Sequence, residues 1–183
     1  MATWTIDPIH SEVKFKVKHL VVATVTGNFQ TFSGTLEAEK EDFSDAKITL
    51  EVDVNSVTTH NEMRDGHLKT ADFFDAANHP KMTFVSKTVT KKPDGELVVT
   101  GDLNLHGVSK EITLDVAYNG TIIGNGSVPT AGFDVTGKIN RKDFGMTFNS
   151  FTEAGHLALG EDVKIEIGLE MHKQAPAELK KAA

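Results

Sequence analysis

The side chains that most often carry enzyme or metal chemistry are sparse and dispersed in this sequence. Its eight histidines include no His-Glu-x-x-His pair, so their spacing gives no support for a zinc hydrolase. Cysteine is absent, which excludes disulfides, thiolate metal sites and a thiol nucleophile. No Gly-x-Ser-x-Gly sequence occurs, and Gly124-Asn125-Gly126 lacks the third glycine of a dinucleotide-binding turn. We therefore expect no catalytic residue, no metal and no cofactor.

Three basic side chains are candidates for holding the polar group of a ligand. His19 ends an apolar strand face on which it is the one polar residue. Arg64 can make a two-pronged contact with an oxyanion, and His67 follows it by about one helical turn. A competing interpretation of Arg64 is a local ion pair with Asp65 that anchors its own segment.

An enzyme acting on a lipid or polyketide-like substrate is the alternative function. Its support is the titratable group of His19 next to an apolar surface. Acidic pairs such as Glu51 and Asp53 fall on outward faces, whereas a catalytic carboxylate pair with a raised pKa needs burial. The residue pattern therefore favours binding over catalysis.

The overall charge excludes two classes of partner. The formal net charge is -7, without the basic stripe that nucleic-acid-binding domains carry. Negative charge also opposes adhesion to an anionic membrane surface. No apolar run approaches the roughly 20 residues of a membrane span, and the opening Met1–Asp7 already resembles a strand rather than a signal peptide. We expect a cytoplasmic protein that is not integral to a membrane.

Alternation of apolar and polar residues is the dominant pattern. Because successive side chains of a strand point to opposite faces, period two predicts half-buried strands. Two further segments, 29–38 with a change of phase near Phe32 and 82–89, are less regular, which brings the count to about eight strands. The regular segments are 13–17, 48–54, 97–105, 112–118, 133–139 and 163–171.

Turns and one insertion interrupt the strands. Turn residues occur at Lys92–Gly95, Asn119-Gly120 and Asn125-Gly126. Residues 61–75 lack strand spacing and predict one or two short helices, broken at Gly66 and restarted near Thr70, which could form a lid. The segment 173–183 is expected to be a helical or flexible tail after a single domain, 1–172.

About eight antiparallel strands can close into a barrel, because closure removes the exposed sheet edges. The interior of such a barrel either fills with side chains or holds one ligand. Alternation alone does not decide between an ordinary packed core and a hollow barrel.

Several blocks of the sequence resemble the YceI-like, polyisoprenoid-binding family. They begin with Trp4-x-Ile6-Asp7-x-x-His10-Ser11 and include Gly27-x-Phe29-x-x-Phe32-x-Gly34. The most diagnostic block is Arg64-Asp65-Gly66-His67-Leu68-Lys69-Thr70-Ala71-Asp72-Phe73-Phe74-Asp75. It is followed by Gly101-Asp102-Leu103 and by Asp143-Phe144-Gly145-Met146. The resemblance covers roughly residues 3 to 172.

The resemblance implies a lipocalin-like barrel that holds a long isoprenoid or similar lipid, such as an isoprenoid quinone or a prenyl diphosphate. It also implies a transport or stress-response role, and a homodimer. Many members of the family carry a secretion signal and are periplasmic, and this sequence differs from them in that respect.

Inward-facing side chains are the candidates for the apolar lining of such a barrel. An apolar tail needs only a dry apolar wall, since each buried CH₂ contributes about 0.8 kcal/mol. Phe73 and Phe74 are expected to close one end from the helical segment. The predicted lining comprises Val13, Phe15, Val17, Phe29, Phe32, Phe73, Phe74, Leu103, Leu105, Phe133, Phe148, Ile165 and Ile167.

Overall fold

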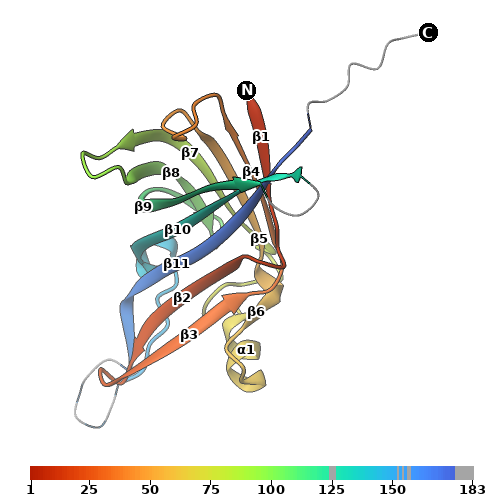
Figure 1. Ribbon diagram of the computed structural model, residues 1–183. Helices are drawn as coiled ribbons and strands as arrows, with labels where there is room; N and C mark the ends of the chain where they lie inside the picture. The colour runs from red at the N-terminus through yellow and green to blue at the C-terminus, as the bar shows by residue number, and fades with distance from the viewer. Residues whose placement is uncertain (124–126, 152, 154, 156–157, 176–183) are drawn as a thin grey trace.

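Antiparallel strands dominate the computed structural model, which describes residues 1–123, 127–151, 153, 155 and 158–175 (Figure 1). The burial of β8 alternates residue by residue along its length, as expected for a strand with one face in the core. Short 3-10 helices lie at Val54–Ser56 and Arg141–Phe144, and the α-helix of the described part is α1 (Glu62–Leu68). The strands are β1 (Ala2–Ile6), β2 (Glu12–His19), β3 (Ala23–Phe29), β4 (Phe32–Ala38), β5 (Lys47–Asp53), β6 (Val57–Thr58), β7 (Lys81–Lys91), β8 (Leu97–Leu105), β9 (Val108–Ile123), β10 (Pro129–Asn140) and β11 (Leu159–Lys173).

Backbone pairing closes the sheet into a barrel. Each strand from β7 to β10 pairs antiparallel with the next one along the chain, up to β11. The long β11 then pairs with β1 at its C-terminal end, with Trp4 opposite Lys173, and with β2 over its preceding part, with Phe15 opposite Ile165. Because β1 pairs with β4, β4 with β5 and β5 with β7, the ring is complete.

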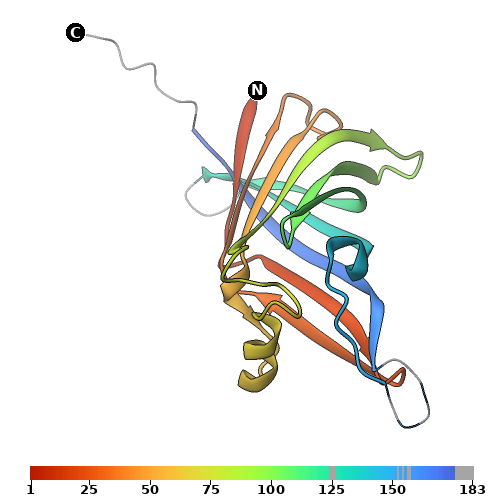
Figure 2. The same ribbon diagram turned by 180° about the vertical axis from the view of Figure 1, so that it is seen from behind.

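The first three strands of the barrel are each broken in two. β1 is followed by β2, β3 by β4 and β5 by β6, and β2, β3 and β6 pair side by side below β1, β4 and β5 (Figures 1 and 2). Two of the breaks are bonded together, because the Ser56 hydroxyl accepts the backbone N–H groups of Gln30 and Thr31 at 3.1 and 3.0 Å. With each broken strand counted once, the predicted eight-stranded antiparallel, lipocalin-like barrel is confirmed.

The helical insertion is shorter than predicted. α1 begins after Asn61, whose side chain accepts the N–H of Arg64 at 3.0 Å, and residues 70–78 form turns instead of a second helix. The predicted break at Gly66 is wrong, because Gly66 lies inside α1. A glycine in an exposed helix costs only about 1 kcal/mol relative to alanine, which a capped helix can tolerate.

One of the turns expected in the sheet is corrected and another is confirmed. Asn119-Gly120 is a bulge within β9 rather than a turn, because Tyr118 pairs with Phe133 and Gly120 with Gly132, which leaves Asn119 as the extra residue. The predicted hairpin turn before Gly95 is confirmed.

The predicted tail begins later than expected, and part of it lies beyond the description. β11 includes Lys173, and the backbone N–H of Gln174 donates to Thr3 at 2.8 Å. The expected turn at Asn125-Gly126 and the tail residues 176–183 fall on the undescribed segments.

One end of the barrel is filled by an aromatic cluster. Phe43, from the connection between β4 and β5, is 2% exposed and packs edge-on against Trp4, Tyr118 and Phe133 at ring-centroid distances of 5.5, 5.0 and 5.1 Å. Its φ of 56° lies in the left-handed region, which is unfavourable for a bulky residue. The packing of its ring compensates for this backbone strain, and this end of the barrel is solid.

Phe43→Ala should therefore lower the free energy of unfolding by about 3–5 kcal/mol, because it leaves a cavity in a packed core. Urea denaturation followed by circular dichroism measures the change. Phe151→Ala is the matched control, since Phe151 is 74% exposed and its loss should change stability by less than about 0.5 kcal/mol. Equal effects of the two substitutions would contradict a solid core at this end.

Candidate functional site: an apolar cavity in the barrel

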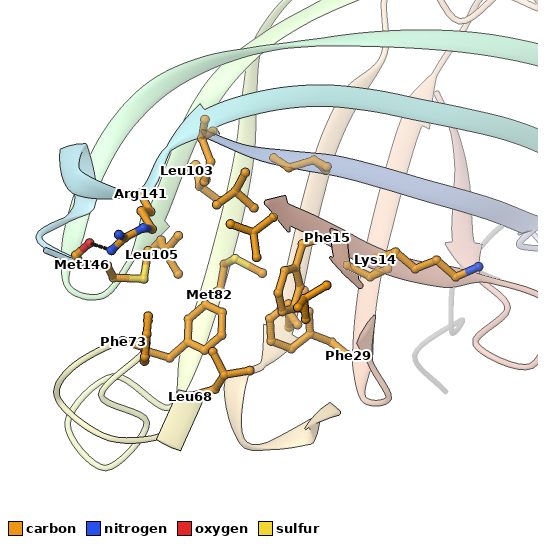
Figure 3. Close-up of a pocket in the computed structure, with 18 of the residues that line it drawn as sticks. Lys14, Phe15, Phe29, Leu68, Phe73, Met82, Leu103, Leu105, Arg141 and Met146 are labelled. Carbon is orange, nitrogen blue, oxygen red and sulfur yellow. Dashed lines mark hydrogen bonds between the residues drawn. The ribbon is translucent and has the colours of Figure 1, made fainter. Parts of the chain in front are cut away.

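The other end of the barrel contains a cavity of about 310 Å³ (Figure 3). Its wall is formed by inward-facing residues of β2, β3, β5 and β7 to β11, by α1 with the turns that follow it, and by residues from the segment 141–150. The Phe43 cluster contributes none of the lining residues. The volume lies at the lower end of the range of small-molecule sites, and the lining is almost wholly apolar.

Glycines in the wall keep the interior open. A Cβ at Gly27 would lie 2.3 Å from Cζ of Phe15, and a Cβ at Gly137 would lie 2.5 Å from Cδ2 of Leu114. Phe15 and Leu114 both line the cavity, and each lies over its glycine in the space that a side chain on that glycine would need. The large residues can therefore lie against the wall instead of filling the centre.

Two groups of aromatic rings border the cavity. Phe15, Phe29 and Phe74 are in mutual contact at centroid distances of 5.6 to 6.0 Å. His67, Phe73 and Phe148 form the second group at 5.0 to 5.4 Å, which joins α1 and the turn after it to the segment that follows β10. Aromatic contacts thus connect the covering segments to the barrel and to each other.

The buried Thr59 fixes α1 to the end of β6. Its backbone N–H and its hydroxyl donate to the Asp65 carboxylate at 2.7 and 2.6 Å, and its hydroxyl also accepts Nε of Arg64 at 2.7 Å. Burial raises the pKa of the Asp65 carboxyl, but the hydrogen bonds from Thr59 and Thr58 and the charge of Arg64 together outweigh it, and the net pKa is lowered. The expected ion pair with Asp65 is not formed: within the described residues, the Arg64 guanidinium and the Asp65 carboxylate do not come within 4.0 Å of each other, and both side chains bond to Thr59 instead.

Arg141 is a buried cation in the wall of the cavity. It is 3% exposed, its Nε donates to the Gly160 carbonyl at 2.9 Å, and its Nη1 donates to the Met146 carbonyl at 2.5 Å. Burial lowers the pKa of this guanidinium, although Glu161 acts in the opposite direction. A guanidinium stays protonated in proteins, so the site carries a positive charge.

Most of the predicted lining residues face the cavity. Phe73 and Phe74 are buried in the turn that follows α1, and both line the cavity from that turn. The predicted residues that line the cavity are Val13, Phe15, Val17, Phe29, Phe73, Phe74, Leu103, Leu105, Phe148, Ile165 and Ile167. Their contact with a ligand stays a prediction.

Phe32 and Phe133 lie elsewhere. Phe133 belongs to the solid end, where it packs against Phe43 and Tyr118. Phe32 begins β4, just beyond the break after β3, and is half-buried against the core without lining the cavity. Both side chains face inward, but they lie at a different height along the barrel.

All three head-group candidates border the cavity. His19 is exposed at the end of β2, opposite Leu159. His67 is exposed and its Nε2 lies 2.8 Å from the Asp72 carboxylate. Arg64 uses Nε and one terminal nitrogen on Thr59. Their role toward a ligand stays a prediction.

Sequence reasoning missed Arg141, although the pattern contained a signal for it. The inward positions of β10 are Phe133, Val135, Gly137 and Ile139, and Arg141 is the next position of the same parity. The criterion that selects His19, a polar residue on an apolar stripe, also selects Arg141. Leu50, Met82, Phe84, Ile112, Leu114 and Ile139 also line the cavity and were not selected.

One group of possible metal ligands lies away from the cavity. Asp7, His10 and Glu170 bring donor atoms within 4.8 Å of one another next to the break between β1 and β2. The hydrogen bond between Asp7 and His10, 2.8 Å long, raises the pKa of His10 and lowers that of Asp7. These contacts explain the cluster as a local link at the β1–β2 break.

Comparison with known proteins gives one family. The family model described as "YceI-like domain" matches residues 4–171. The Staphylococcus aureus (strain MSSA476) protein named UPF0312 protein SAS2572 is 42% identical over 172 residues, which cover 93% of this chain and 97% of that protein.

Solved structures share the barrel. A Campylobacter jejuni YCEI protein has a TM-score of 0.73 at 34% identity, with 87% of this chain and 91% of that chain covered. Burkholderia cenocepacia BcnA has a TM-score of 0.77 at 24% identity, with coverage of 90% and 98%. A polyisoprenoid binding domain from Saccharophagus degradans has a TM-score of 0.63 at 18% identity, with coverage of 93% and 98%. Within the described ranges, no helix has the length and apolarity needed to cross a membrane.

The Thr59 hydroxyl should be essential for holding α1 over the cavity. Thr59→Val should lower stability by about 1–3 kcal/mol, because it leaves buried polar partners unsatisfied, and should speed amide hydrogen exchange in α1. Hydrogen exchange with mass spectrometry measures the exchange rate in α1. The control is Thr26→Val, at an exposed position of β3. Unchanged exchange in α1 would argue against this anchor.

Proposed function

The chain belongs to the family of YceI-like domains, and from this membership we propose that it sequesters or transports a long-chain isoprenoid or similar amphiphilic lipid inside its barrel. One observation in this chain carries the proposal: the barrel is packed solid at one end and holds an apolar cavity at the other. A barrel with no ligand to bind would be more stable with side chains packed at both ends, because a packed interior gains more dispersion energy than an open one.

The chemistry of the wall suits an apolar chain. A bound tail loses its contact with water, which contributes about 0.8 kcal/mol per CH₂. Branched aliphatic and aromatic side chains such as Val17, Ile165 and Phe29 offer such a tail contacts without hydrogen-bonding requirements. Selectivity among apolar tails then depends on shape and length, and the polar end decides orientation.

The segments that cover the cavity supply a route for ligand exchange. α1 and its turn are attached to the barrel by local polar contacts and aromatic edges rather than by strand pairing. Such elements open at lower cost than the sheet itself. We place the polar end of the ligand at the end of the cavity where His19, Arg64 and His67 meet solvent.

The Saccharophagus degradans domain supports the ligand class by its name, as a polyisoprenoid binding domain of the same fold. At 18% identity the likeness concerns the fold, so the nature of the guest rests on the cavity of this chain. A homodimer remains part of the proposal and can be measured by sedimentation.

Native mass spectrometry of the purified protein, followed by organic extraction, tests the function. We expect either a co-purified lipid or, after delipidation, stoichiometric uptake of the C20 prenyl alcohol geranylgeraniol. A chain that carries no lipid and takes up no prenyl alcohol would overturn the proposal.

Gly27→Val provides the matching variant. Because a Cβ there would meet the Phe15 ring, the ring must move into the cavity, and geranylgeraniol affinity should fall at least about tenfold while the fold persists. Gly132→Val is the control, since a Cβ there meets its nearest neighbour at 3.6 Å and Gly132 does not line the cavity. Calorimetric titration of both variants measures the difference, and equal affinities would place the ligand outside this cavity.

A further inference from the structure

Arg141 is a buried cation whose hydrogen bonds are incomplete. Two of its three guanidinium nitrogens donate to the Gly160 and Met146 carbonyls. The third, Nη2, is buried and has no hydrogen-bond partner among the described residues. Buried donors in native proteins are nearly always satisfied, so an orphaned nitrogen calls for a missing partner.

The positive charge also has no carboxylate in direct contact, although Glu161 acts on it from a greater distance. Within the described part of the chain, no carboxylate oxygen lies within 4.0 Å of the Arg141 guanidinium. The nearby Glu161 carboxylate is bound to Lys142 at 2.5 Å, and Asp162 is bound to Lys138 at 3.0 Å. Buried charges are ordinarily paired, because removing an ion from water is expensive.

The position of this cation points to the ligand. Arg141 lines the apolar cavity next to Met146, to whose carbonyl it donates, while Phe15 and Phe29 are drawn on the opposite side of the labelled apolar residues (Figure 3). Its partner Gly160 packs against Lys18, and the neighbouring Leu159 pairs with His19. The Arg141 cation therefore lies at the same end of the cavity as the head-group candidate His19, but it is buried in the wall whereas His19 is exposed.

We propose that Arg141 binds the carboxylate of an acidic, long-chain amphiphile whose tail extends toward Phe15 and Phe29. This inference rests on the proposed function and names the class of ligand for the same cavity. An acidic head group supplies both missing elements at once, because it accepts a hydrogen bond from Nη2 and neutralises the guanidinium.

Other head groups fit this position less well. A neutral alcohol or quinone carbonyl can accept the hydrogen bond but leaves the buried charge uncompensated. A diphosphate needs several donors, whereas Arg141 has one free nitrogen because the other two are used on carbonyls. A carboxylate matches a single cationic donor most closely.

The wild-type protein can be tested with three ligands that share one tail. Phytanic acid, its methyl ester and the corresponding alcohol differ only in the head group, and calorimetric titration of the delipidated full chain measures their affinities. We expect the acid to bind at least about tenfold more tightly than either neutral ligand, as for a hydrogen bond to a charged group. Equal affinities would overturn the role of Arg141 while leaving the lipid-binding function in place. Failure of all three to bind would overturn both.

A protein-side test separates ligand contact from a structural role. Arg141→Gln removes the charge but keeps a side-chain amide that can donate to a carbonyl, so it should weaken the acid about 10- to 100-fold and leave the ester unchanged. Lys164→Gln, which removes an exposed charge on β11 and leaves the Lys142–Glu161 pair intact, is the control and should keep the preference for the acid. Equal weakening of acid and ester by Arg141→Gln would show a purely structural role. If this variant does not fold, the three-ligand comparison decides.

Discussion

The structure depends on how the edge of β11 is shared. This long strand is paired by β1 at its C-terminal end and by β2 over its preceding part, so one continuous strand joins the two halves of the barrel. Antiparallel pairing on both sides of β11 satisfies backbone groups that an open edge would leave unpaired, and the ring cannot close without it. The breaks between β1 and β2, β3 and β4, and β5 and β6 let the wall change direction while that closure is kept.

The two ends of the barrel then follow different packing rules. At one end a loop residue, Phe43, enters the interior and completes a cluster with Trp4, Tyr118 and Phe133. At the other end Gly27 and Gly137 allow Phe15 and Leu114 to lie against the wall, and the centre stays open. The solid end supplies stability, and this allows the open end to keep a cavity that costs packing energy.

Polar groups near the cavity have two distinct roles. Thr59, Arg64 and Asp65 satisfy one another and hold α1 in place. Arg141 secures the Gly160 and Met146 carbonyls, yet keeps a charge and a donor for which the described chain offers no partner. The mostly apolar wall thus contains a buried donor and charge at Arg141, and our proposal places the acidic group of the guest there.

The sequence by itself determined the strands and their inward faces, because period two is a local property of an extended chain. It therefore placed Val13, Phe15, Ile165 and most other wall residues on the correct face, and the same parity reaches Arg141. Only the tertiary structure decided which inward residues meet the cavity and which meet the core, as Phe133 illustrates. Parity gives the face of a strand but not the height along the barrel, which depends on register, on the strand breaks and on a loop residue from elsewhere.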